Sequence, residues 1–315
     1  WSLADISHVI CVSHTSKENT VLRARMTDPT RVSVIPNATD TTVFTPCPSL
    51  KYKNWSGTEN ITIVVMARLV YRKGTDLMVD VIPDICRRYP NVDFIIAGDG
   101  PRRIQVEEMI ERNSLYDRVE MLGEVQHADV KRVLRRGQIF LNCSLTEAFC
   151  IAIIEAASCG LLVVSTRVGG VPEVLPSDIL LLANPEPQSL IDTVQEALVK
   201  VRFVSPWDMH NRVANMYTWD DVARRTEVVY NKVVCERSPD FLERCKIKYQ
   251  RGWFFGKILL GLEVLDYLLW QVLERASPRS DIDIAQDFPY EYFCNNKDHL
   301  LKDDSNDLGQ GVGQG

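Results

Sequence analysis

The amino-acid sequence predicts an α/β fold in which a doubly wound parallel sheet is covered by helices on both faces. Short aliphatic runs recur from residue 60 onward, and they are continuous rather than alternating, which is typical of strands buried on both faces. Segments with helical periodicity separate these runs, as parallel strands require. The expected strands cover residues 61–66, 92–97, 119–122, 139–142, 161–165 and 179–183, and the expected helices cover 75–89, 101–113, 127–136, 147–158, 170–175 and 187–201.

The composition is that of an ordinary globular protein and excludes several classes. The chain has 315 residues, of which 45% are hydrophobic and 25% are charged, and its length suggests about two domains. A net charge of −6 argues against nucleic-acid binding, which needs a basic face. The 9 cysteines form no CxxC pair, so we expect a reducing compartment, no disulfide framework and no zinc site.

The segments around the regular alternation suggest further boundaries. Prolines punctuate a polar stretch over residues 46–59, which indicates a linker. Residues 207–236 indicate one or two helices that pack back on the domain. Residues 277–315 are polar and end in GQGVGQG, which predicts a disordered tail.

Residues 253–273 form a hydrophobic stretch of membrane-span length, but Lys257, Glu263 and Asp266 interrupt it. Each central charge costs roughly 2.5–3.5 kcal/mol of insertion free energy. The composition of this segment therefore favours an amphipathic helix on a protein or membrane surface over a true span.

Ligands of doubly wound sheets bind beyond the carboxyl ends of the strands, so the residues that follow each strand are the candidates for a site. Arg68 and Lys73 follow the first strand. Two cations at this place can clamp a diphosphate, and Arg supplies a bidentate fork. Taken alone, they are better explained as solvated loop cations, which is the more common fate of Lys and Arg.

Glycines follow two other strands. Gly98 and Gly100, in AGDGP, would allow a ligand to approach the backbone closely, although an ordinary turn with Asp99 as helix cap explains them as well. Gly169 and Gly170 precede an expected helix and could present backbone amides to an anion, or form a flexible loop.

Two acids, Glu147 and Glu155, lie eight residues apart in SLTEAFCIAIIEAASCG. On a continuous helix this spacing puts both carboxylates on nearly the same face. Glu147 could instead simply favour the helix dipole and Glu155 could be a surface acid, but the small and apolar residues around Glu155 argue against solvation. Together, the cations, glycine turns and acids at the strand ends favour a nucleotide-diphosphate ligand.

The order ARL-x3-KG, GDGP, E-x7-E and VGGVPE over residues 60–236 resembles the family 4 retaining glycosyltransferases. Their GT-B fold has two Rossmann-like domains, and the C-terminal one holds most of the nucleotide sugar. Five segments resemble the branch of this family that acts in GPI-anchor synthesis. They are SLTEAFCIAIIEAASCG, STRVGGVPEVLP, YTWDDVARRTEVVY and, further upstream, VSHTSKENTVLRA and VIPNATDTTVFTP. Cys150, where many family members have Gly, is typical of that branch.

The resemblance implies an activity and a setting. This branch transfers N-acetylglucosamine from UDP-GlcNAc to phosphatidylinositol, with retention and without a metal or cofactor. It works with other subunits of a multi-subunit enzyme at the endoplasmic reticulum membrane, with the catalytic domain on the cytoplasmic side. Two alternatives stay open: another family 4 glycosyltransferase, or a non-catalytic chain that binds only donor nucleotide or partner subunits.

The resemblance also implies roles for single residues. Glu155 matches the acid that holds the donor ribose, and Glu147 matches the one that contacts the donor sugar. Arg68 and Lys73 match the cations that neutralise the diphosphate, and with Glu147 they are the expected catalytic residues. The remaining expected donor-binding residues are Gly98, Gly100, Phe149, Cys150, Gly169 and Gly170.

Two expectations concern the ends of the chain. Residues 1–45 match only the last part of the family's N-terminal domain, so we expect this chain to bind UDP or UDP-GlcNAc but to transfer poorly alone. Residues 253–273 stand where the family has a membrane span, so we expect a membrane anchor there. Glu263 and Asp266 would then pair with another protein of the complex inside the membrane.

Overall fold

The computed structural model describes residues 6–24, 28–47, 60–237, 239–250 and 252–281. The chain divides into two compact units, residues 1–237 and residues 238–315. Most of the expected linker at 46–59 and most of the expected tail at 277–315 lie outside the described residues.

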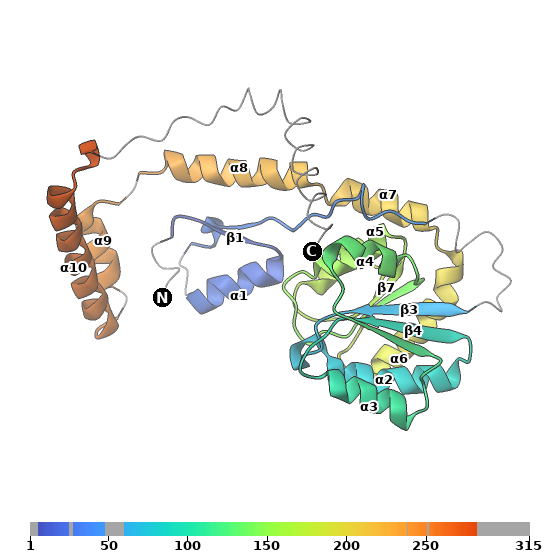
Figure 1. Cartoon of the computed structure of the whole chain (residues 1–315). Coiled ribbons are helices and arrows are strands. Elements are labelled where there is room, and N and C mark those ends of the chain that lie inside the picture. Colours follow the sequence, from blue (N-terminus) through green and yellow to red (C-terminus); the bar gives the residue numbers. More distant parts are fainter. Residues whose placement is uncertain (1–5, 25–27, 48–59, 238, 251, 282–315) are drawn as a thin grey trace, which may run out of the picture. The chain divides into compact units, whose positions relative to one another are not determined.

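The core of the first unit is a six-stranded parallel sheet, as predicted (Figure 1). Its strands are β3 (Ile61–Met66), β4 (Val92–Ala97), β5 (Val119–Gly123), β6 (Ile139–Asn142), β7 (Leu162–Thr166) and β8 (Leu180–Ala183). They lie in the order β5-β4-β3-β6-β7-β8. From β3 the chain adds β4 and β5 toward one edge of the sheet. It then crosses to the other side of β3 and adds β6, β7 and β8 toward the opposite edge. The crevice of a doubly wound sheet therefore opens between β3 and β6.

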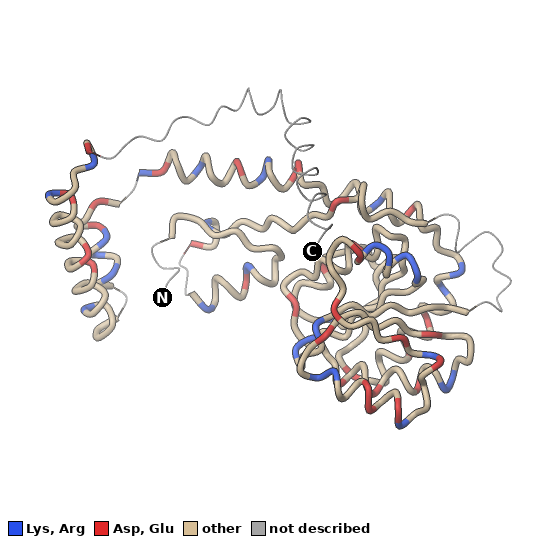
Figure 2. The backbone as a smooth tube through the Cα atoms, viewed as in Figure 1, with Lys and Arg blue, Asp and Glu red and all other residues tan. Residues whose placement is uncertain are grey.

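Helices cover both faces of this sheet. One face carries α2 (Thr75–Arg88), α3 (Arg103–Arg112) and α6 (Pro187–Lys200), and the other carries α4 (His127–Leu134), α5 (Ile151–Ser158) and α7 (Pro206–Met216). Each strand sends alternate side chains to the two layers. Acidic and basic residues are interspersed over the helices that cover the sheet (Figure 2).

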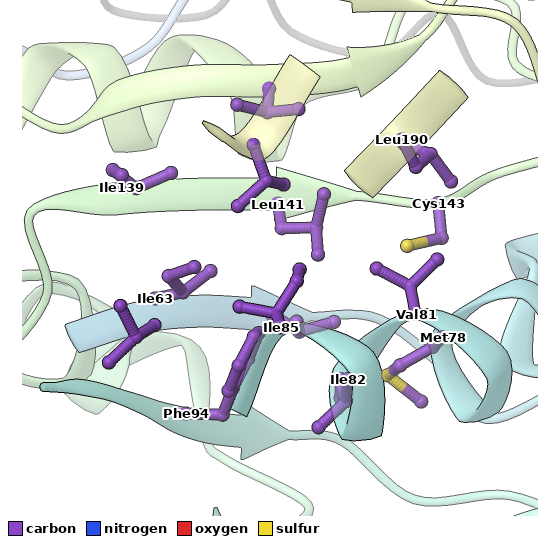
Figure 3. Close-up of a cluster of buried hydrophobic side chains, with 14 of the residues drawn as sticks. Ile63, Met78, Val81, Ile82, Ile85, Phe94, Ile139, Leu141, Cys143 and Leu190 are labelled. Carbon is purple, nitrogen blue, oxygen red and sulfur yellow. The ribbon is translucent and has the colours of Figure 1, made fainter. Parts of the chain in front are cut away.

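The layer under α2 shows why these segments fold together. Ile63, Phe94 and Ile139, from three neighbouring strands, belong to the same buried cluster as Ile82 and Ile85 of α2, and all are almost fully buried (Figure 3). Burying a side chain of this size stabilises the fold by about 1.5–3 kcal/mol. The continuous aliphatic runs thus mark the strands because both of their faces are buried.

Two predicted helices are wrong in part. The helix expected at 147–158 begins only at Ile151, because Cys150 has φ 74° and ψ 83°, in the left-handed region that interrupts a right-handed helix. Glu147 consequently lies in a loop, and the prediction that it shares a helix face with Glu155 is wrong. The helix expected at 170–175 is reduced to one 3₁₀ turn, η3 (Val171–Glu173).

The remaining elements of the first unit flank the sheet domain. Short strands β1 (Val9–Cys11) and β2 (Val32–Val34) pair in parallel, and α1 (His14–Ala24) connects them. Helix α1 lies off the carboxyl end of the large sheet (Figure 1). After α7, which packs on α5, comes α8 (Trp219–Cys235), so the region predicted as one or two helices contains two. The other short 3₁₀ turns of the first unit are η1 (Pro29–Arg31), η2 (Tyr71–Lys73) and η4 (Val201–Phe203), and the second unit contains η5 (Arg279–Asp281).

The described part of the second unit contains two helices, α9 (Phe241–Tyr249) and α10 (Phe255–Ala276), that pack on each other. Glu263 of α10 is only 7% exposed and accepts hydrogen bonds from Arg244 and Lys248 of α9. Lys248 contributes most, and together the two cations outweigh the effect of desolvation and hold the pKa of Glu263 below its ordinary value. The predicted partner of Glu263 within a membrane is therefore wrong, since its charge is neutralised inside the hairpin.

The membrane span predicted at 253–273 is not supported. A helix forms there, but none of the helices in the described ranges has the length and apolar character needed to cross a bilayer. Lys257, Glu263 and Asp266 interrupt the apolar run, which is the physical reason.

Loss of core packing under α2 should be costly. We expect Ile82→Ala to lower the free energy of unfolding of the first unit by about 2–5 kcal/mol, because it leaves a cavity at a fully buried position. Urea titration followed by tryptophan fluorescence measures this. The matched control is Ile104→Ala on α3, where the side chain is exposed and the change should be within about 0.5 kcal/mol. Equal effects of the two substitutions would contradict the described core.

Candidate functional site

The loops that follow β3 and β6 lie side by side at the crevice of the sheet. The amide of Leu145 donates to the carbonyl of Arg72 at 2.9 Å, which joins the two loops through their backbones. The ammonium of Lys73 binds the carboxylate of Glu147, which joins them through their side chains. Two residues predicted from different segments of the sequence are thus brought together at the switch point of the strand order.

Glu147 is held from two sides. Its side chain is 11% exposed, whereas that of Lys73 is 35% exposed. The hydroxyl of Ser144 lies 2.9 Å from Glu147 Oε1 and 2.8 Å from Asn142 Oδ1, so its single proton can be donated to either oxygen. Because α5 begins only at Ile151, Glu147 lies outside the first turn of that helix. Its place is set by Lys73 and Ser144.

Arg68 faces a separate cavity at the ends of β3, β4 and β5. This cavity has a volume of about 600 Å³ and is also lined by Gly98, Gly100 and Glu124. Arg68 is exposed and forms no ion pair with any residue in the described ranges. It is therefore a cation available to a ligand in this cavity, whereas Lys73, the other predicted cation, does not line it.

Gly98 serves the packing of two loops. A Cβ atom at this position would lie 2.0 Å from the carbonyl oxygen of Ala67, and its φ of +142° is rarely adopted by other residues. Asp99 does not cap α3 as an ordinary turn would suggest. Its carboxylate accepts from the amide of Gly100 at 2.6 Å and from Arg103 at 3.1 Å, and the N-cap of α3 is Arg102.

The second glycine pair is fastened to the backbone of Glu147. A Cβ atom at Gly169 would lie 1.9 Å from the carbonyl oxygen of Glu147, and Gly169 has φ +51°. The amide of Gly170 donates to the same oxygen at 3.1 Å. The amide of Gly170 is thus hydrogen-bonded within the protein. The loop that contains it holds the backbone of Glu147 in place without any ligand.

Cys150 and Phe149 lie between the two acids but differ in their surroundings. Cys150 has the left-handed backbone that glycine adopts without strain, which explains why glycine suits this position in the resembling family. Burial, and then the nearby charge of Glu147, raise the pKa of its thiol to about 12. Phe149 is buried and packs edge-on against Tyr217, with 5.6 Å between ring centroids, so its side chain belongs to the core.

Glu155 is a buried acid, not a surface one. It lies on α5 and is 8% exposed, and its carboxyl group forms no hydrogen bond with the described residues. Burial raises the pKa of Glu155, and the charge of His127 offsets part of this shift. A buried carboxyl without a protein partner costs free energy that a ligand with hydroxyl donors would recover.

Glu173, at the end of the second glycine motif, is the site-forming residue to which the sequence analysis gave no role. Its carboxylate accepts from the amide of His14 at 2.6 Å, and from the amide and hydroxyl of Thr15 at 2.9 and 2.7 Å. It thereby satisfies the free amides at the start of α1. Partial burial acts to raise the pKa of Glu173, but the hydrogen bonds from Thr15 and His14 outweigh it and lower that pKa.

Metal ligands were not expected from the sequence. Within the ranges that the structure describes, no group of three or more His, Cys, Asp or Glu residues is placed to hold a metal ion.

Comparison with known proteins gives close relatives. Residues 50–202 match the family model described as glycosyl transferases group 1. The chain is 53% identical over 287 residues to a phosphatidylinositol N-acetylglucosaminyltransferase subunit of Arabidopsis thaliana, and the match covers 91% of this chain and 63% of the relative. It is 48% identical over 311 residues to the subunit of the same name in Homo sapiens, covering 97% and 63%. It is 39% identical over 305 residues to the GPI3 subunit of Saccharomyces cerevisiae, covering 94% and 67%. The chain thus spans about two thirds of the length of these curated relatives.

Solved structures show the same fold at low identity. Sucrose-phosphate synthase from Thermosynechococcus elongatus superposes with a TM-score of 0.62 at 21% identity, covering 74% of this chain and 59% of that one. Anabaena Alr3699/HepE in complex with UDP and glucose superposes with a TM-score of 0.60 at 22% identity, covering 75% and 65%. These likenesses agree with the glycosyltransferase fold that the sequence predicted.

Glu173 should stabilise the first unit in a pH-dependent way. We expect Glu173→Gln to lower the free energy of unfolding by about 1 kcal/mol, because an amide is a weaker cap than a carboxylate. The lowered pKa of Glu173 means that its contribution is fully present above the ordinary value of 4.5 and is lost as pH falls through the folded value. Urea titrations of both proteins at pH 7 and at successively lower pH measure the difference. A gap that stays constant below pH 4.5 would contradict the role of the charge.

Proposed function

The chain belongs to the family of phosphatidylinositol N-acetylglucosaminyltransferase subunits that includes GPI3, and from this premise we propose that it transfers N-acetylglucosamine from UDP-GlcNAc to phosphatidylinositol. This reaction is the first step of GPI-anchor synthesis. Because the chain spans less than two thirds of the first of its relatives, we assign complete transfer to the assembled enzyme and donor binding to the chain itself.

The ion pair between Lys73 and Glu147 at the sheet crevice is the observation that carries this proposal. Glu147 holds the ammonium of Lys73 at the carboxyl end of β3, and Arg68 lies in the same loop. Both cations would meet the diphosphate of the donor. Because Lys73 is already held by Glu147 before the reaction begins, it would stabilise the charge that develops on the departing UDP with little reorganisation.

Glu155 supplies the second support for a nucleotide donor. Its buried carboxyl lacks a protein partner in the described ranges. The paired hydroxyls of a ribose would donate two hydrogen bonds to it, and such bonds favour the ionised form that burial opposes. We therefore assign ribose binding to Glu155 and contact with the donor sugar to Glu147.

The reaction proceeds with retention by substitution on one face of the sugar. The bond from the anomeric carbon to the diphosphate oxygen breaks, and a bond to an inositol oxygen forms on the same face. A phosphate oxygen of the departing UDP accepts the proton of the inositol hydroxyl. A double displacement needs a carboxylate free to attack the anomeric carbon, whereas Glu147 is bound to Lys73 and Glu155 is buried in α5.

The names of the relatives and the surface of α10 support a proposed setting. The relatives are named as subunits, so we propose that this chain also works within a multi-subunit enzyme, at the cytoplasmic face of the endoplasmic reticulum membrane. One stripe of α10 is apolar, exposed and without a charge. It consists of Ile258, Leu262, Leu265, Leu269 and Val272. We propose that this stripe rests on the lipid surface, which is where an amphipathic helix meets a lipid substrate.

Binding of the donor nucleotide by the full chain tests the proposed function. We expect Arg68→Ala and Glu155→Ala each to weaken binding of UDP at least tenfold, because each loses a charged hydrogen-bonding partner worth about 1.5–3 kcal/mol. Isothermal titration measures this. Arg132→Ala on α4, an exposed arginine paired with Asp129, is the matched control and should bind as the unchanged chain does. EDTA should leave the affinity unaltered. A folded chain that binds neither UDP nor UDP-GlcNAc would contradict the proposed function.

Sedimentation with lipid vesicles tests the role of α10. We expect the chain to co-sediment with vesicles of phosphatidylcholine and phosphatidylinositol, and Leu265→Asp to reduce the bound fraction severalfold because it places a charge in the middle of the apolar stripe. Val199→Asp introduces the same charge at an exposed apolar position of α6 and should bind normally. Equal binding by all three proteins would exclude the stripe as the contact.

A further inference from the structure

A second cavity, with a volume of about 410 Å³, lies between α1 and the loops that follow β6 and β7. Glu147, Ala148 and Gly169 line one side of it, and Thr146 lies beside them. The other side is formed entirely by α1. Its size falls within the usual range of small-molecule sites.

The α1 side of this cavity is polar. Ser16, Asn19, Thr20 and Arg23 line it, and their spacing of three, four and seven residues places them on one face of the helix. The amide nitrogen of Asn19 donates to the Thr15 carbonyl at 3.1 Å, and the Thr20 hydroxyl donates to the Ser16 carbonyl at 2.8 Å. The side-chain oxygen of Asn19 is thus an acceptor for a hydroxyl group of a ligand, and Thr20 Oγ1, which also lies 3.5 Å from Cys11 Sγ, keeps a second acceptor position.

The cavity carries one uncompensated positive charge. The carboxylate of Glu147 is neutralised by Lys73. Arg23 is exposed and forms no ion pair with the part of the chain that the structure describes. The cavity therefore suits a ligand that has several hydroxyl groups and a single negative charge.

Helix α1 is fastened in place before any ligand binds. Glu173 caps its first amides, and the hydroxyl of Ser13 accepts from the amide of Ser16 at 3.1 Å. Gly170 leaves room for this contact, because a Cβ atom there would lie 2.6 Å from Ser13 Oγ. A preformed cavity costs a ligand less ordering on binding.

We propose that this cavity binds the polar head of the acceptor, an inositol joined to a phosphodiester. Arg23 pairs with the phosphodiester, and Ser16, Asn19 and Thr20 hydrogen-bond the ring hydroxyls. The inference rests on the proposed function. The donor sugar does not explain the cavity equally well, because it is uncharged, whereas Arg23 is a cation without an ion pair among the described residues. Glu147 borders the cavity, so an acceptor there lies next to the donor site.

Titration of the full chain with glycerophosphoinositol, a soluble form of this head group, tests the inference. We expect the chain to bind it, and Arg23→Gln to weaken this binding about tenfold or more while leaving UDP affinity unaltered. Lys17→Gln is the matched control, since it removes the same charge from the same helix at a residue outside the cavity. Its affinity for glycerophosphoinositol should be unchanged. Asn19→Ala should weaken glycerophosphoinositol binding and leave glycerophosphocholine binding as it is.

Three results would overturn the inference. The first is a chain that binds UDP but not glycerophosphoinositol, which removes the acceptor site and leaves the donor site standing. The second is a loss of UDP binding in Arg23→Gln, which assigns the cavity to the donor. The third is inorganic phosphate binding as tightly as glycerophosphoinositol, which reduces the site to Arg23 alone. A chain that binds glycerophosphoinositol but not UDP would instead remove the proposed donor function and leave this cavity as an inositol site.

Discussion

The ion pair between Lys73 and Glu147 is the contact on which the site depends. It joins the loops after β3 and β6. These two strands are neighbours because the chain adds β4 and β5 on one side of β3 and then β6, β7 and β8 on the other side. Glu147 is almost buried, so removing Lys73 would leave a carboxylate whose burial costs free energy. The pair therefore stabilises the crevice and orients the two groups that face it.

The glycines of the motifs support this arrangement through the backbone. Gly98 lets the loop after β4 touch the loop after β3, and Gly169 lets the loop after β7 touch Glu147. Each contact is too close for a side chain. These glycines thus hold neighbouring loops together, and the charged groups on those loops are fixed before a ligand arrives, as electrostatic stabilisation requires.

Two cavities lie at the ends of the strands, and Glu147 lines one of them. Arg68 and the glycines after β4 line the first cavity, and α1 lines the second, together with Glu147. Glu173 attaches α1 to the loop after β7, so a helix from the start of the chain lines a cavity whose other side is formed by the loops of the sheet domain.

By itself, the sequence determined the strands and the residues at their ends. The aliphatic runs at 61–66, 92–97 and 139–142 match β3, β4 and β6, because a strand that is buried on both faces needs a continuous run of apolar residues. Only the tertiary structure decided where α5 begins, because the left-handed backbone of Cys150 depends on the packing around it. It alone paired Glu263 with α9 rather than with a partner in a membrane, and joined Glu173 to α1. Such contacts link residues far apart in the chain, and local periodicity carries no information about them.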